Sequence, residues 1–272
     1  MNPTPGPIEA QLPAPPFDIV VLGAGRVGTS YARALERAGH RILAELGRGD
    51  DPSPITKADV VIVSVPDSTL REAAGMVARL GRSGAVIVHT CGLEGIEPLS
   101  DCGPLVAAIH PAMPVAERGQ RLDGVTFGVT CPEQLRQWCT AFVSDLGGRA
   151  QFIGEHDRPL YHAAFVMASN FAVALAGDAA EILGDHEILE PLLRATVDNI
   201  ARLGPDDALT GPVVRGDATT VRAHLRALPP HLVEVYVVCA RRALERAVAS
   251  GRLDQGGVAA ITAALDEAVV AS

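Results

Sequence analysis

The segment VLGAGRVGTSYARALERAGHRI at residues 21–42 limits the possible folds more than any other part of the chain. Gly23, Gly25 and Gly28 have G-x-G-x-x-G spacing, follow an apolar run and open a stretch with helical periodicity. The first glycine permits a tight turn, the second lets a pyrophosphate approach the backbone, and the third lets the helix pack on the strand. Free N–H groups at the helix start would face the phosphates. The segment therefore predicts a strand–turn–helix unit that binds a dinucleotide.

Further apolar runs of strand length follow along the first half of the chain. They are RILAELG, ADVVIVSVP, GAVIVHT and PLVAAIHP, with VTFGVT and RAQFIG after them, and helical segments lie between several of them. These runs are continuously apolar rather than alternating, which is typical of parallel strands covered by helices on both faces. We therefore predict an α/β fold with a doubly wound parallel sheet.

The strands stop near residue 155, and only helical segments follow. We therefore expect a disordered, proline-rich tail at 1–16, a dinucleotide-binding domain at 17–154 and an all-α domain for substrate binding and dimerisation at 155–272.

The segment YHAAFVMASNFAVALAG at 161–177 contains no charged residue, and its length reaches the lower limit for a membrane span. Its histidine, serine and asparagine would be costly in lipid, and acidic residues continue the helix. We expect instead a helix that is buried on all sides.

The composition narrows the classes of partner. The chain has a net charge of −9 and no dense run of Lys or Arg, so we expect a small-molecule substrate and neither nucleic acid nor a membrane as partner. The five cysteines lack C-x-x-C spacing, and histidines and cysteines do not cluster at ligand spacing. We therefore expect no metal site and reduced thiols, as in a cytoplasmic protein. The first residues also lack the pattern of a signal peptide.

The residues about 20 positions after the glycines indicate which dinucleotide binds. A carboxylate here would pair with the ribose hydroxyls of NAD or of a methyltransferase cofactor, but the chain has Gly47 followed by Arg48. An arginine can bind a 2′-phosphate through its planar fork, so NADPH is favoured over NADH. Two alternatives stay open: Glu45 reaches a ribose, or Arg48 is only a solvated loop charge.

Four further residues are expected to contact the cofactor. Arg26 and Val27 lie between the second and third glycines, and Val65 and Pro66 end the third strand. In doubly wound sheets, ligands lie at the carboxyl ends of the strands, so both pairs should face the dinucleotide.

The ends of the fourth and fifth strands supply candidates for the chemistry. Thr90 and Cys91 follow one strand, and His110 ends the other. A histidine near the nicotinamide can protonate or polarise the group that a hydride reduces. The alternative for His110 is a structural hydrogen bond at a strand end. Cys91 is a poor candidate nucleophile, because hydride transfer needs none.

Polar side chains also share one stripe of the apolar helix. His162, Ser169 and Asn170 follow helical spacing with the valines at 166 and 173. Such side chains need polar partners, which a substrate pocket offers. The alternative is hydrogen bonding between helices or across a dimer.

The loop ALTGPVVRGDATTV at 208–221 contains another candidate, Arg215, which could hold an anionic group of the substrate. Alternatively, Arg215 pairs with Asp217 in a rigid connector. Asp217 or Thr219 is expected to cap the helix that follows.

Six motifs, LGAGRVGTS, SVPDSTL, HTCGLEG, IHPAMP, YHAAFVMASNF and LTGPVVRGDATTV, resemble in this order an uncharacterised family. That family joins a Rossmann-like domain to a C-terminal helical domain of unknown function. It is similar to the group of pyrroline-5-carboxylate reductase, ketopantoate reductase and prephenate dehydrogenase. The resemblance implies an NAD(P)-binding first domain and a homodimer through the second.

The resemblance also bears on the catalytic residues. In prephenate dehydrogenases a His-Pro after the fifth strand polarises the substrate, which matches His110 and Pro111. Ketopantoate reductases place a lysine on the long helix, but here His162 and Asn170 are the nearest polar equivalents.

Together these observations predict an NADPH-dependent oxidoreductase that reduces a small carbonyl or imine bearing a carboxylate, such as a ketopantoate-like 2-keto acid. His110 or His162 would donate the proton, and Ser169 and Asn170 would orient the substrate. The alternative is a non-catalytic NADP-binding sensor or scaffold.

Overall fold

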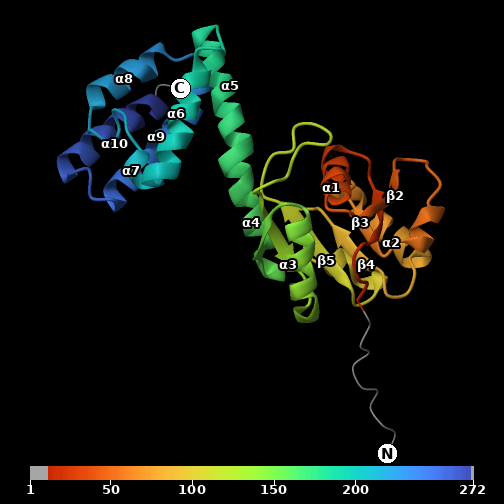
Figure 1. Cartoon of the computed structure of the whole chain (residues 1–272). Helices are drawn as coiled ribbons and strands as arrows, with labels where there is room; N and C mark the ends of the chain where they lie inside the picture. Colours follow the sequence, from red (N-terminus) through yellow and green to blue (C-terminus); the bar gives the residue numbers. More distant parts are fainter. Residues whose placement is uncertain (1–11, 271–272) are drawn as a thin grey trace, which may run out of the picture. The chain divides into compact units, whose positions relative to one another are not determined.

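The computed structural model describes residues 12–270 (Figure 1). These residues form two compact units, which divide between Phe171 and Ala172. The strands are β1 (Asp18–Leu22), β2 (Arg41–Leu46), β3 (Val60–Val63), β4 (Val86–His89), β5 (Val106–Pro111), β6 (Thr126–Thr130) and β7 (Arg149–Phe152). The helices are α1 (Arg26–Arg37), α2 (Leu70–Leu80), α3 (Arg136–Asp145), α4 (Arg158–Phe165), α5 (Phe171–Leu183), α6 (Leu189–Leu203), α7 (Pro205–Ala208), α8 (Ala218–Ala227), α9 (Pro230–Ala249) and α10 (Gln255–Val270).

The seven strands form one sheet in the order β2-β1-β3-β4-β5-β6-β7. Strands β1 to β5 are parallel, which confirms the predicted doubly wound α/β fold. Strand β6 pairs antiparallel with β5, and β7 runs parallel to β6. No helix lies between β5 and β6, and without a crossover helix a returning strand pairs antiparallel. The sheet is therefore mixed at this edge.

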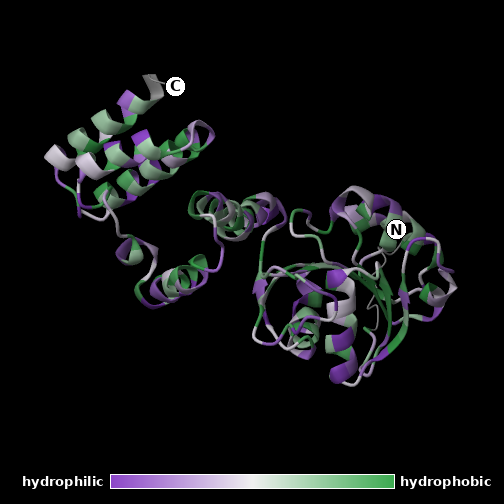
Figure 2. Cartoon of the chain, turned by 90° about the horizontal axis from the view of Figure 1, so that it is seen from above, coloured by the Kyte–Doolittle hydropathy of each residue, from purple (hydrophilic) through white to green (hydrophobic). Residues whose placement is uncertain are grey.

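Helices cover both faces of the sheet, and each face has its own apolar core. One core contains Tyr31 and Leu35 of α1 with Phe142 of α3, and the other contains Leu70 and Val77 of α2. Figure 2 shows the sheet as mostly hydrophobic, with hydrophilic residues on the flanking helices. Strands β3 and β4 are buried along their whole length, and β1 and β5 nearly so, which explains their continuously apolar sequences.

The strand order locates the point where a ligand is expected. The chain passes from β1 to β2 on one side and later returns to β3 on the other side of β1. This reversal leaves a crevice at the carboxyl ends of β1 and β3, where ligands of doubly wound sheets bind.

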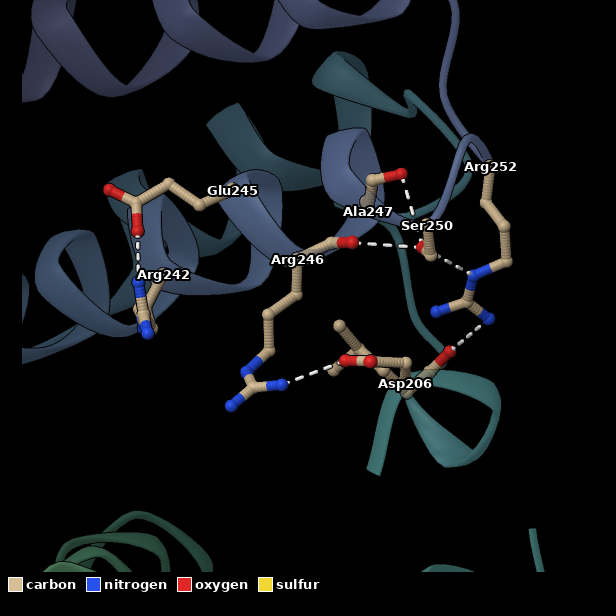
Figure 3. A network of polar contacts seen from close by, with 8 residues as sticks. Asp206, Arg242, Glu245, Arg246, Ala247, Ser250 and Arg252 are labelled. Carbon is tan, nitrogen blue, oxygen red and sulfur yellow. Dashed lines mark hydrogen bonds and ion pairs between the residues drawn. The ribbon is translucent and has the colours of Figure 1, made fainter. Parts of the chain in front are cut away.

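The second unit is built around α8, α9 and α10, which bury Val221, Val237 and Ile261 among them. The short α7 is joined to α9 by an ion pair between Arg246 and Asp206 at 2.7 Å (Figure 3). Asp217 caps α8 as predicted, because its carboxylate accepts a hydrogen bond from the N–H of Thr220 at 3.0 Å.

The continuous helix Glu155–Leu183 includes α4, a π-helical turn and α5. By length and composition it could cross a membrane, with a mean hydropathy of 1.4 over its most apolar window. The expected burial on all sides is not found within one chain: the side chains of Phe171 and Val173 are more than half exposed. The reason is that α5 makes only sparse contacts with the other elements described.

The two compact units divide after Phe171, later than the predicted boundary between 154 and 155. The strands do end at β7, but Arg158 of α4 is completely buried against the strand ends, so α4 packs as part of the first unit. Residues 1–11 of the predicted tail lie outside the described residues, and Leu12 packs against the first core.

Candidate functional site

The glycine loop has the geometry of a phosphate cradle. Gly23 has a φ of +112°, and a Cβ there would lie 2.1 Å from the backbone oxygen of Ser64. A Cβ at Gly28 would lie 2.1 Å from the oxygen of Gly23, so β1, β3 and α1 meet here without room for a side chain. A Cβ at Gly25 would meet nothing within 4 Å. Gly25 is the N-cap of α1, so its open side leaves space for a pyrophosphate against the helix N-terminus.

A pocket of about 710 Å³ adjoins this loop, and we call it the glycine-loop pocket. Its walls are residues 22–25, the turn after β2 at 46–50, residues 64–66 and one side of α2. Arg48 lines it as predicted, and so does Arg118 from the loop between β5 and β6. Arg118 was not predicted, because residues 115–125 contain no recognisable motif.

Acidic groups also lie near the glycine-loop pocket. Asp50 and Glu72 are part of its wall, and the carboxylate of Asp50 accepts a hydrogen bond from the N–H of Gly47 at 2.7 Å. Glu45, the alternative ribose ligand, does not line the pocket and instead forms an ion pair with Arg33 at 3.0 Å.

A second pocket, of about 470 Å³, lies at the ends of β4 and β5, and we call it the histidine pocket. Its lining includes the predicted residues Arg26, Val27, Thr90, Cys91, His110 and His162. Both pockets share Gly25, Ser64, Val65 and Pro66, so they adjoin along the end of β3. A dinucleotide would have its phosphates at this shared wall and its two ends in the two pockets.

His110 is oriented by the first turns of α4. Its Nδ1 lies 3.0 Å from Oη of Tyr161, and its ring lies edge-on to that of His162 at 6.1 Å between centroids. The Tyr161 hydroxyl can donate to Nδ1 at this distance, and we assign its hydrogen to that bond. His110 is therefore assigned its own hydrogen on Nε2.

The Nε2 side of His110 faces Gly92. A Cβ at Gly92 would lie 2.9 Å from Nε2 of His110 and 2.7 Å from Cδ2 of His162, so only glycine leaves the two rings free. The loop position of Gly92 therefore keeps this N–H available to a ligand.

Burial and nearby cations keep His110 neutral. The pKa of His110 is lowered to about 3, and burial is the largest cause. The charges of Arg158, His162 and His89 lower this pKa further. At neutral pH the His110 ring is therefore uncharged. It can donate a hydrogen bond, but it cannot give up a proton as an imidazolium would.

The residues after β4 are fixed rather than reactive. His89 is fully buried; its Nδ1 accepts the N–H of Cys91 at 3.2 Å, and its Nε2 donates to the oxygen of Gly95 at 2.6 Å. Burial raises the pKa of Cys91 to about 11, which keeps its side chain a thiol. A thiol is a poor nucleophile, so Cys91 stays a poor candidate for that role. Thr90 donates its hydroxyl to Oγ of Ser64 at 3.1 Å.

Arg158 lies beneath the histidine pocket, and sequence analysis did not select it. Its guanidinium donates to Oγ1 of Thr130 at 2.7 Å and to the backbone oxygens of Ala108 at 2.8 Å and Gly128 at 3.1 Å. A weaker contact of 3.5 Å reaches the oxygen of Cys91. These bonds join the ends of β4, β5 and β6 to α4.

Three predicted residues lie outside the histidine pocket. Ser169 and Asn170 belong to the π-helical turn, Val166–Asn170, which interrupts the α-helical spacing after His162. Arg215 lies in the second unit, where it lines a separate hollow next to Arg252. The roles of these three residues stay predictions.

Two domain families match the sequence. The Rossmann-like domain matches residues 49–111, and a domain of unknown function, DUF2520, matches residues 125–243. The chain therefore joins a Rossmann-like domain to a DUF2520 domain, as the sequence motifs predicted. No curated protein matches the sequence significantly.

Several solved structures are similar. A Bacteroides fragilis protein provisionally named an NADP oxidoreductase is 25% identical over 84% of this chain and 98% of its own, with a TM-score of 0.73. A Thermotoga maritima protein is 25% identical over 85% and 99%, with a TM-score of 0.65. A pyrroline carboxylate reductase from Plasmodium falciparum with NADP bound shares the fold at 12% identity over 90% and 98%, with a TM-score of 0.55. These similarities support an oxidoreductase.

Two glycine substitutions should separate folding from cofactor binding. We expect Gly23→Ala to lower the melting temperature, because its backbone conformation and its contact with Ser64 exclude a Cβ. Gly25→Ala should leave the melting temperature nearly unchanged and abolish NADPH binding, because its Cβ projects into the crevice. Thermal unfolding and titration calorimetry measure the two effects. Normal NADPH binding by Gly25→Ala would contradict the cradle.

Proposed function

We propose that the protein is an NADPH-dependent oxidoreductase that reduces a small carbonyl or imine bearing a carboxylate, such as a ketopantoate-like 2-keto acid. One observation supports this above all: a glycine cradle with arginines adjoins, through the end of β3, a pocket with two histidines. This arrangement fits a dinucleotide whose reactive end meets a substrate among hydrogen-bonding groups.

The glycine-loop pocket fits the phosphates of NADP. The open face of Gly25 receives the pyrophosphate, and Arg48 binds the 2′-phosphate, with Arg118 as a second cation on the same wall. When bound, the cofactor supplies a hydride. The name of the Bacteroides fragilis protein, which includes NADP, supports the choice between the two nicotinamide cofactors.

The two histidines have different roles in this proposal. His110 is neutral and presents Nε2–H, so it donates a hydrogen bond to the group being reduced and polarises it. His162 lines the same pocket and supplies the proton. Ser169 and Asn170, on the turn that follows His162, orient the substrate.

We further propose that the chain forms a homodimer through α5 and α6. Large apolar side chains are exposed on both helices, among them Val173 (71%) and Val197 (63%). Exposed apolar area of this extent is rare in soluble monomers, and symmetric pairs are the commonest way to bury it. We also propose a cytoplasmic location, which the likeness to a protein named as an NADP oxidoreductase supports.

The cofactor assignment can be tested at Arg48. Arg48→Ala should weaken NADPH binding about tenfold to a hundredfold, because a charge-assisted bond to the 2′-phosphate is lost, and should leave NADH binding nearly unchanged. Titration calorimetry with both cofactors measures the difference. Arg79→Ala, on the exposed end of α2, is the matched control. An equal loss for NADPH and NADH would exclude Arg48 as the 2′-phosphate ligand.

The reaction can be tested with a panel of 2-keto acids and cyclic imines. With NADPH, the wild-type chain should oxidise the cofactor in the presence of at least one of them. His162→Gln should lower kcat by about 10² to 10⁴, because a proton donor is lost, and should leave NADPH binding unchanged. Full turnover by His162→Gln would remove His162 from the chemistry. NADPH binding without turnover of any substrate would favour the sensor instead.

The dimer can be tested with paired substitutions. Val173→Asp and Val197→Asp should each convert a dimer to a monomer in analytical ultracentrifugation, because an unpaired charge would be buried. Val238→Asp on α9 is the control, since Val238 is also exposed (61%) but lies on neither helix. A monomeric wild-type chain that sediments with lipid vesicles would overturn the dimer and indicate a membrane contact.

A further inference from the structure

Arg158 places a buried positive charge next to the histidine pocket. The residue is 0% exposed, and its strongest hydrogen bonds go to Thr130 and two backbone oxygens rather than to a carboxylate. No ion pair of Arg158 is found within residues 12–270. The carboxylate of Glu155 acts electrostatically on Arg158. It already accepts hydrogen bonds from the N–H groups of Ile96 and Glu97. Neutral acceptors hold the cation in place but do not cancel its charge, and burial of such a charge is costly.

The sign of this charge distinguishes two kinds of reduction. Addition of a hydride to a carbonyl carbon moves the π electron pair to oxygen, which becomes negative and then takes a proton. Addition of a hydride to a protonated imine moves the pair to a nitrogen that was positive and becomes neutral. In both cases the dihydronicotinamide is the reductant, and it becomes the nicotinamide cation when it gives up the hydride. A fixed positive charge stabilises the first transition state and disfavours binding of the second substrate.

The hydrogen bonding of His110 makes the same distinction independently. The Tyr161 hydroxyl bonds to Nδ1, so the pocket receives an N–H donor from Nε2. A carbonyl oxygen accepts from this donor. A protonated imine also presents an N–H, and two donors cannot bond to each other.

We propose that the buried Arg158 charge makes the histidine pocket selective for a neutral carbonyl compound over a protonated imine. This proposal rests on the reductase function and narrows its substrate class. Arg158 acts as a positioning residue, since it reaches the substrate only through His110 and through its electric field.

The first test follows the His110 ring by NMR in the full-length protein across pH. The groups that face His110 are Arg158, Tyr161 and His162 of α4, and His89 and Cys91 at the end of β4. Arg158→Gln should raise the pKa of His110 by about one pH unit, because a cation beside it is removed while burial remains. Arg158→Lys should keep the wild-type titration, because the charge remains. An unchanged titration in Arg158→Gln would overturn the proposal.

The second test compares kcat/KM for 2-keto acids and for cyclic imine carboxylates with NADPH. The wild-type chain should prefer the keto acid, Arg158→Gln should reduce that preference about tenfold, and Arg158→Lys should retain most of it. If Arg158→Gln does not fold, the wild-type preference decides, because a pocket beside a fixed positive charge should turn over the neutral keto acid better than the protonated imine. Thr130→Val, which removes one acceptor of the guanidinium but keeps its charge, should retain the preference. A wild-type preference for the imine, or an equal loss in the Gln and Lys variants, would overturn the selection.

Calorimetry with NADPH and NADH separates this proposal from the function beneath it. If neither cofactor binds the wild-type chain, the proposed reductase fails, whatever the titration of His110 shows. If a cofactor binds and the preference is for imines, the reductase stands and the role of Arg158 fails.

Discussion

The approach of the β1 backbone to the end of β3 determines the rest of the site. At Gly23 and Ser64 the two backbone segments are so close that a methyl group on Gly23 would overlap the backbone oxygen of Ser64. This contact occurs where the strand order reverses, and it positions both the N-terminus of α1 and residues 64–66. Those residues form the wall shared by the two pockets. The glycine at 23 is therefore required by packing, whereas a Cβ at Gly25 would meet nothing within 4 Å, so packing does not require the glycine there.

The fold could be predicted from sequence because its signals are local. Continuous apolar strands, glycine spacing and the cap at Asp217 each act within a few residues, and the structure contains all of them. The reversed direction of β6 and β7 was not predictable from their apolar runs, because strand direction depends on the connection. The apolar helix is exposed within one chain. The sequence shows that a segment needs burial but not what covers it.

Apart from His162 on α4, the site was predicted where residues follow strand ends. Thr90, Cys91 and His110 lie together because parallel strands end at one edge. Arg158 and Tyr161 were not predicted, because their partners lie on strands far away in sequence. Tyr161 contacts the ring of His110, and Arg158 bonds to Thr130 and to backbone oxygens of β5 and β6. Arg158 looks like an ordinary charged residue at a helix start. Its role depends on carbonyl groups of Ala108 and Gly128, which any sequence could supply. Arg118 was missed for a similar reason, since only the path of a long loop brings it to the pocket.

The histidine pocket cannot be assigned to either matched domain alone. Thr90 and His110 come from the part that matches the Rossmann-like family, whereas Tyr161 and His162 come from the DUF2520 match. Glu155 and Arg158 of the second match also hold the loop after β4, through the N–H of Ile96 and the oxygen of Cys91. The Rossmann-like part thus provides the glycine loop, and α4 provides the buried charge of Arg158 and the hydroxyl of Tyr161 that orients His110. Because the first compact unit ends only at Phe171, a chain cut at the end of β7 would keep the cradle and lose the groups that give the pocket its chemistry.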